Sequence, residues 1–445
     1  MNFEQIKALL FEAAAAQGLM QYDVYYRTTA DESAQALNRE PSSCSSGLIG
    51  GVCFRCAVNG RIGSAATQCF TKEELEALVQ RAVANAAVMD ADEEPIFFRG
   101  SDAAAYRAVD TKPPELPGVA LLRRTAMELQ EKLYAQSDMM TDGTTTEAGA
   151  TRVTVALANS NGLCLSRDAG AVYTYVEPIL SDGNEPSFGS AFAPTLSTDT
   201  DIVQKATDEA IARLGAGELK TGVYDVIFDA RQMRTMLSAF AGIFSGKNAL
   251  QGLSLLKGRE GEQIAAPCFT LIDDPFYDEN PMQCAFDAEG VPTREKVLVD
   301  RGVLQTLLYD LTNARKAGVA PTGNASRGYA DPVSIAPYCL RILPGKESRE
   351  ELLCRMGEGL YITELKGLHA GADAVTGDFS IESAGFVVKG GKITRPVHSF
   401  TVAGNFFTLL KQIDGVASNV QMGVPATTVM AAPDVLVRGL DVAGE

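Results

Sequence analysis

The stretch GLYITELKGLHAGADAVTGDFSIESAGFVVKGGKITRPVHSFTVAGN, residues 359–405, decides the fold of the largest part of this chain. Polar and apolar residues alternate over 360–364, 384–388 and 392–397, which predicts three short strands. Gly390 and Gly391 lie between the last two strands and predict a two-residue hairpin, because glycine adopts the positive φ that a primed turn requires. The stretch therefore predicts a strand-rich scaffold.

Loops between these strands carry groups that could form a site. His369 and Asp378 are each flanked by glycines, and Asn405 closes the stretch. These three residues are candidates for lining a substrate cavity. The alternative for His369 is a loop histidine satisfied by an ordinary hydrogen bond, and we expect His398, in a strand pattern after Pro396, to be structural.

The rest of the chain predicts an α+β protein of three parts. An Asn59-Gly60 turn joins two predicted strands and is followed by a capping motif at Thr71, which together indicate a small α+β unit over residues 1–110. Predicted helices over 119–136 and 199–214 enclose strands and indicate a second small unit over 111–220. Residues 221–445 are expected to form a larger, strand-rich and barrel-like domain.

The composition of the chain indicates its cellular compartment and excludes some classes of binding partner. The net charge of −17 without a basic stripe argues against nucleic-acid binding, and no stretch approaches the roughly 20 apolar residues of a membrane span. The N-terminus MNFEQIKALLFEAAAA has no basic region before its apolar residues, so we expect a helix there and no signal peptide. Nine cysteines are then expected to be reduced thiols in a cytoplasmic protein.

Three segments of the chain resemble one known family, in that family's order. They are GVCFRCAVNGRIGSAAT (51–67), AFDAEGVPTREKVLVDRGVLQTLLYDLTNARKAGVAPTGNA (285–325), and the series TELKGLHAG, VTGDFS, AGFVVKGGKI and TVAGN within 363–405. The chain is similar to the TldD/PmbA peptidase family, and more similar to its PmbA (TldE) branch than to TldD.

The resemblance also implies where a metal would be expected. The TldD branch has a His-Glu-x-x-x-His motif on a helix and a metal-binding cysteine close to its C-terminus. The corresponding helix here contains MLSAFAGIF (236–244), without histidine or carboxylate, and the last cysteine is Cys354. A catalytic zinc takes about three protein ligands. We therefore expect no catalytic residue, metal ligand or cofactor in this chain, and zinc in a TldD-type partner.

Other motifs are weaker. Cys53 and Cys56 have redox spacing, but positions i and i+3 of a strand point to opposite faces, so we expect two buried thiols. The acidic segment 273–279 lacks the ligand spacing of a calcium loop, and we expect a solvated acidic turn. The loop 322–328 contains Asn324 and Arg327, which are candidates for lining an interdomain cavity, although such a Gly-Asn loop is also common as a simple turn.

These features favour a PmbA/TldE-like, non-metal subunit of a cytoplasmic peptidase that acts on unfolded or short peptides. The resemblance implies a heterodimer with a TldD-like subunit, and links the family to peptide maturation, antitoxin turnover and modulation of DNA gyrase. The alternative is a non-enzymatic homodimer that binds peptides. A third and weaker hypothesis is a metal held across a homodimer by His369 of each chain.

Overall fold

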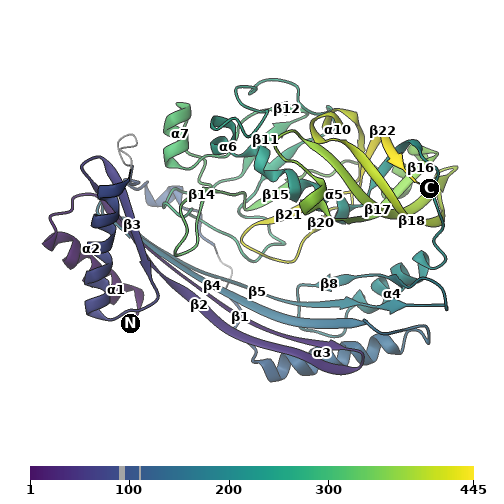
Figure 1. Ribbon diagram of the computed structural model, residues 1–445, viewed down its shortest axis with the longest axis horizontal. Coiled ribbons are helices and arrows are strands. Elements are labelled where there is room, and N and C mark those ends of the chain that lie inside the picture. Colours follow the sequence, from purple (N-terminus) through teal and green to yellow (C-terminus); the bar gives the residue numbers. More distant parts are fainter. Residues whose placement is uncertain (90–95, 110–111, 445) are drawn as a thin grey trace.

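The computed structural model describes residues 1–89, 96–109 and 112–444. A long curved sheet runs along one side of the molecule, and the C-terminal half lies over it (Figure 1). The domain boundary predicted at 110/111 lies outside the described residues, and the domain limits stay a prediction.

One antiparallel sheet unites strands from both predicted small units. Its order is β3-β2-β1-β4-β5-β8. The strands are β1 (Tyr22–Leu37), β2 (Glu40–Val58), β3 (Arg61–Thr67), β4 (Thr145–Asn159), β5 (Cys164–Glu177) and β8 (Ala191–Ala193). Strand β1 pairs with the whole of β4, from Asp23 opposite Asn159 to Leu37 opposite Thr145.

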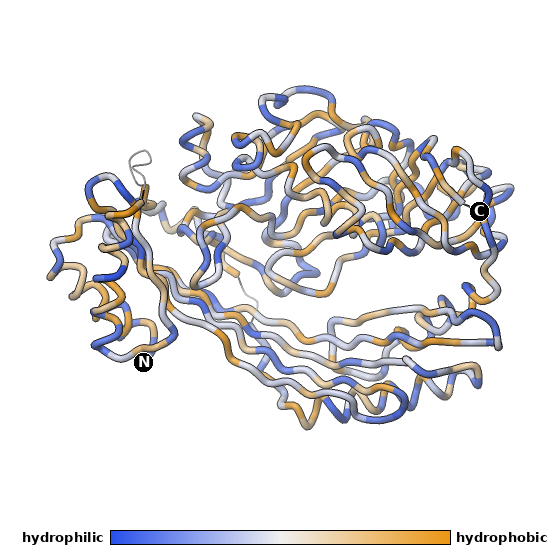
Figure 2. The backbone as a smooth tube through the Cα atoms, in the orientation of Figure 1, coloured by the Kyte–Doolittle hydropathy of each residue, from blue (hydrophilic) through white to orange (hydrophobic). Residues whose placement is uncertain are grey.

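Different parts of the protein pack on the two faces of this sheet, because successive side chains of a strand point to opposite faces. Helices α1 (Phe3–Ala16) and α2 (Lys72–Val88) pack on the face that carries Phe54 and Cys56. Cys53 points to the opposite face and packs against the C-terminal half. The expectation that the two thiols lie on opposite faces of a strand and are buried is confirmed. Apolar and polar segments alternate along these strands (Figure 2).

The C-terminal half contains a closed five-stranded barrel, which confirms the predicted α+β class with a barrel-like domain. Its strands are β9 (Gly222–Phe228), β16 (Gly359–Lys366), β17 (Asp378–Lys389), β18 (Lys392–Asn405) and β22 (Val435–Ala443). Pairing of β18 with β22 closes the barrel. The predicted turn at Gly390-Gly391 is confirmed, because Lys389 lies opposite Lys392.

A second sheet shares its hydrophobic core with the barrel and carries the candidate site. Its order is β12-β11-β10-β15-β21-β20. The strands are β10 (Leu271–Asp273), β11 (Lys296–Asp300), β12 (Val303–Leu304), β15 (Cys339–Ile342), β20 (Gln421–Met422) and β21 (Val429–Ala432).

The remaining elements connect or cover these sheets. Helices α3 (Val119–Tyr134) and α4 (Ile202–Arg213) pack against the long sheet. The others are α5 (Ala230–Phe240), α6 (Gly246–Leu250), α7 (Leu311–Ala317), α8 (Arg349–Met356), α9 (Leu368–Gly371) and α10 (Phe406–Gln412), with 3₁₀ turns Ala103–Ala105 and Ala241–Phe244. Short strands are β6 (Ile179–Leu180), β7 (Ser187–Phe188), β13 (Ala325–Ser326), β14 (Ser334–Ile335) and β19 (Ile413–Val416). Within the described ranges, no helix has the length and apolarity needed to cross a bilayer.

Candidate functional site

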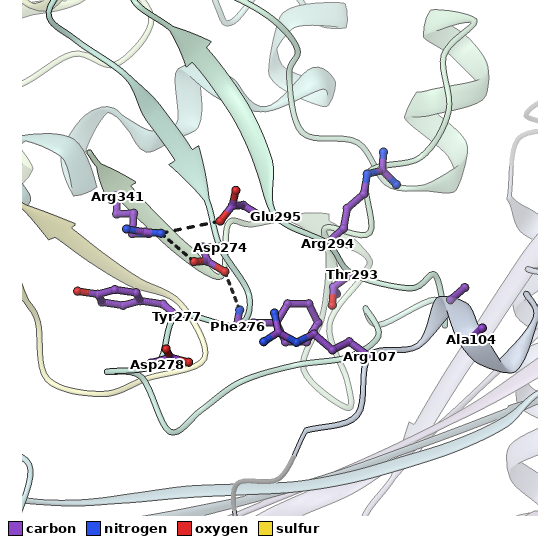
Figure 3. Close-up of a pocket in the computed structure, with 11 residues that line it drawn as sticks. Ala104, Arg107, Asp274, Phe276, Tyr277, Asp278, Thr293, Arg294, Glu295 and Arg341 are labelled. Carbon is purple, nitrogen blue, oxygen red and sulfur yellow. Dashed lines mark hydrogen bonds and ion pairs between the residues drawn. The ribbon is translucent and has the colours of Figure 1, made fainter. Parts of the chain in front are cut away.

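A cavity of about 550 Å³ lies where the second sheet meets the segment after α2. Its lining is Ala104, Ala105, Arg107, Asp274, Phe276, Tyr277, Asp278, Thr293, Arg294, Glu295 and Arg341 (Figure 3). Strand β10 ends at one wall of the cavity, β11 begins at a second, and Arg341 projects from β15. Residues far apart in the sequence therefore meet in one polar hollow.

The charges of this cavity are only partly paired. Arg341 contacts Asp274 at 3.0 Å and Glu295 at 3.8 Å (Figure 3), and its Nε is buried without a hydrogen-bond partner. The Arg107 guanidinium lies 4.6 Å from the centre of the Phe276 ring. Guanidinium groups present several donors in a fixed plane and suit carboxylate or carbonyl ligands. The chemistry of this lining suits a polar ligand.

The acidic segment 273–279 is only partly the solvated turn that its composition predicts, because Asp278 and Glu279 are exposed but its first two carboxylates are not. Asp273 is fully buried, with Lys296 Nζ 3.1 Å from its Oδ2. Asn324 Nδ2 donates to the same oxygen at 2.7 Å. Asp274 is also buried. A buried carboxylate needs such partners, and these come from strands and loops that the local sequence does not reveal.

Asn324 and Arg327 of the loop 322–328 are both buried, and each contacts a different part of the protein. Asn324 donates to Asp273, which directly precedes the cavity-lining Asp274. Arg327 instead reaches β1, where its Nη2 lies 3.4 Å from Asp23 Oδ1. Asp23 is also bound by Arg55. The nearby guanidinium groups lower the pKa of Asp23 even though burial alone would raise it.

The other three candidates lie on the barrel. Asn405 Nδ2 donates to Asp378 Oδ1 at 2.9 Å, so the structure brings these two together. Asn405 Oδ1 accepts from the amides of Phe407 and Thr408 and caps α10. His369 is exposed on the four-residue helix α9. None of these three belongs to the lining of the 550 Å³ cavity.

Two segments of this chain match domains of a known protein family. Residues 221–444 match the PmbA/TldA metallopeptidase C-terminal domain, and residues 22–86 match the PmbA/TldA metallopeptidase domain 1. The chain belongs to the TldD/PmbA metallopeptidase family.

Individual relatives agree with this family. The chain is 31% identical over 280 residues to a metalloprotease of Methanothermobacter thermautotrophicus, an alignment covering 60% of this chain and 61% of that protein. The match thus spans less than two thirds of this relative. A PmbA metalloprotease homologue of Haemophilus influenzae is 28% identical over 367 residues, covering 76% of this chain and 78% of the relative.

Solved structures of similar proteins share the whole architecture. A Thermotoga maritima protein, named as a candidate modulator of a DNA gyrase, is 30% identical and superposes with a TM-score of 0.88, over 99% of this chain and all of that one. TldE from Thermococcus kodakarensis is 21% identical with a TM-score of 0.86, again over 99% of this chain, and shares its fold.

The helix at which TldD/PmbA family metal chemistry is expected does not fit zinc in this chain. Helix α5 follows barrel strand β9, and Met236, Phe240 and Ile243 are fully buried in the apolar core. The carboxylate before the helix, Asp229, accepts from the Gln232 amide as the helix cap. Across the residues that the structure describes, no three His, Cys, Asp or Glu side chains group to hold a metal ion.

Sequence reasoning missed the arginines of the cavity. Arg107, Arg294 and Arg341 come from three distant segments, and no local motif marks them. The only available signal was the arginine on strand β15, whose neighbours Leu340 and Ile342 are buried while Arg341 lies on the other face. A charged residue between two buried apolar residues of a strand shows which face of the strand is polar. It does not show which residues that face contacts in the folded protein.

Proposed function

We propose that this chain is the PmbA/TldE-like, non-metal subunit of a TldD/TldE-type peptidase. The observation that carries the proposal is helix α5, which has the family's position for metal ligands but contributes apolar side chains to the core. Several relatives named as PmbA metalloproteases support the choice of branch. In this proposal a TldD-like subunit supplies the zinc, and this chain binds no cofactor.

The role of this subunit would be to hold an unfolded or short peptide. The mixed arginine and carboxylate lining of the 550 Å³ cavity offers partners for backbone carbonyls and charged side chains. The first half of β2, residues 40–50, pairs with β1, whereas β3 pairs only with Val52–Val58. Most of that half is exposed, and such an edge can accept an extended chain by backbone pairing.

The proposed setting is the cytoplasm, and the substrates are peptides. The link of a relative to a DNA gyrase supports a protein or peptide target, because a chain with a net charge of −17 repels the phosphates of DNA. Proteolysis and peptide maturation belong to the proposed complex, with the chemistry in the partner subunit.

The test is affinity purification of the tagged full chain from its own organism, followed by mass spectrometry and native mass measurement. We expect a second chain at a 1:1 ratio that carries His-Glu-x-x-x-His. The reconstituted pair should cleave an unfolded peptide, and a Glu→Gln change in the partner's motif should abolish cleavage. A purification with the tag alone is the control.

Two other outcomes would reject the subunit proposal. A metal-free homodimer that binds peptides without cleaving them would establish the binding-protein alternative. A homodimer that copurifies with metal, and loses that metal after His369→Ala, would instead establish the shared-histidine hypothesis.

A further inference from the structure

A second, smaller cavity lies between the long sheet and the C-terminal half, apart from the 550 Å³ cavity. Strands β1, β4 and β5 supply one side, and residues 284, 286–288, 325–327, 336–338 and 427–428 supply the other. Its volume is about 30 Å³. That space holds one or two water molecules, or one group the size of a halide or carboxylate. Thr428 is exposed, so the cavity reaches the surface at this residue.

Three guanidinium groups line this cavity, on Arg27, Arg167 and Arg327. The Arg327 side chain is 1% exposed, and its Nε and Nη1 are buried without a hydrogen-bond partner. Arg167 Nη1 is buried without a partner as well. Each guanidinium nitrogen is a donor that costs free energy when buried unsatisfied. Two arginines with unsatisfied donors therefore line one small space.

The carboxylates near these arginines do not balance the positive charge. Asp23 is shared between Arg55 and Arg327, and Glu289 lies 3.6 Å from Arg55. The third carboxylate, Asp287, accepts three backbone amides, and burial together with Glu289 raises its pKa to about 7. With Arg55, which shares Asp23, four arginines thus lie near at most three negative charges.

We propose that this cavity binds one small monovalent anion, a carboxylate group or a halide, held by Arg167 and Arg327. The anion would satisfy the unpaired donors and supply the missing negative charge, and a charge-assisted bond to a guanidinium is stronger than a neutral one. The carboxylate could belong to a peptide that enters past Thr428, or to a free small acid. The site does not depend on the proposed peptidase complex.

The test measures thermal unfolding of the full chain at constant ionic strength, with gluconate replaced stepwise by chloride, bromide or formate. Gluconate is too large for 30 Å³. The wild-type Tm is expected to rise by roughly 2 °C between 1 and 100 mM of the small anion. Arg167→Gln should abolish this dependence, and the exposed Arg123→Gln on α3 should keep it.

A second measurement locates the ion. Crystals of the full chain soaked in bromide should show an anomalous peak in contact with the Arg167 and Arg327 guanidinium groups. Displacement of bromide by excess formate would identify a carboxylate site, and its retention a halide site. The proposal is overturned if no peak appears there, if a peak appears while Tm is independent of the anion, or if Arg167→Gln keeps the wild-type dependence.

Discussion

Asp287 shows how burial changes the chemistry of a single residue. Its Oδ1 accepts the amides of Glu289 and Val291, and its Oδ2 accepts the amide of Ala325. Burial and the neighbouring Glu289 carboxylate raise its pKa from 3.8 to about 7. The folded protein therefore holds a proton there that the unfolded chain releases, and this contribution to stability is present at low pH and lost as the pH rises to about 7.

This linkage predicts the pH dependence of Asp287→Asn. The variant cannot ionise, so the unfolding free energy of the wild type minus that of the variant should fall by about 2 kcal/mol from pH 5 to pH 8. Urea unfolding at each pH unit measures it. The control is Asp182→Asn at an exposed position, for which the difference in unfolding free energy from the wild type should be constant across this pH range. A constant difference for Asp287→Asn would show that its pKa is ordinary.

At the scale of elements, the contact between β3 and α2 depends on the absence of a side chain. A Cβ at Gly63 would lie 2.0 Å from the Ala82 carbonyl oxygen and 2.4 Å from the Ala86 nitrogen. Both are backbone atoms of α2, so the helix cannot relieve the contact by moving a side chain. This close approach sets the distance between the helix and the sheet.

Gly63→Ala should therefore destabilise the protein by about 2–3 kcal/mol, since overpacking forces backbone shifts. The matched control is Gly47→Ala on β2, where an added Cβ would meet nothing within 4 Å. The control should change stability by less than about 0.5 kcal/mol. The denaturant midpoints of the two variants give the comparison, and equal midpoints would contradict the packing argument.

At the scale of the whole molecule, buried arginines join the long-sheet region to the C-terminal half at two places. Arg327 reaches Asp23 of β1 at one of them. At the other, Arg213 of α4 donates from Nη2 to the Thr363 carbonyl of β16 at 2.9 Å, and its Nη1 lies 3.5 Å from Glu364. The same Nη2 also donates to Glu209 at 2.7 Å.

Arg213→Met should loosen the second junction and cost about 2 kcal/mol, because the Thr363 carbonyl loses its donor and the largely buried Glu364 keeps only Lys366 as an ion-pair partner. Limited proteolysis should then cut the connection at residues 214–221 faster than in the wild type. Adding Glu364→Gln should recover part of the loss, since it removes a largely buried charge that then has only Lys366 beside it. A variant cut at the wild-type rate would show that this ion pair does not hold the two halves together.

Local signals in the sequence determined much of the fold. The turns at Asn59-Gly60 and Gly390-Gly391 are confirmed, because each depends on residues that are adjacent in the chain. The helix cap predicted at Thr71 is confirmed for the same reason, since its side chain accepts from the Glu74 amide. The order of residues alone was also sufficient to assign the family and to show that MLSAFAGIF (236–244) contains no histidine or carboxylate to bind a metal.

Only the tertiary structure decided how distant segments combine. It joined β1 to β4 in a single sheet, and it buried Asp273 between Lys296 and Asn324 where composition predicted a solvated turn. It also gathered Arg107, Arg294 and Arg341 into one cavity, and turned Arg167 and Arg327 toward another. A carboxylate or a guanidinium has the same local sequence whether it is solvated or buried. Its burial, charge balance and hydrogen bonds depend on residues that only folding brings beside it.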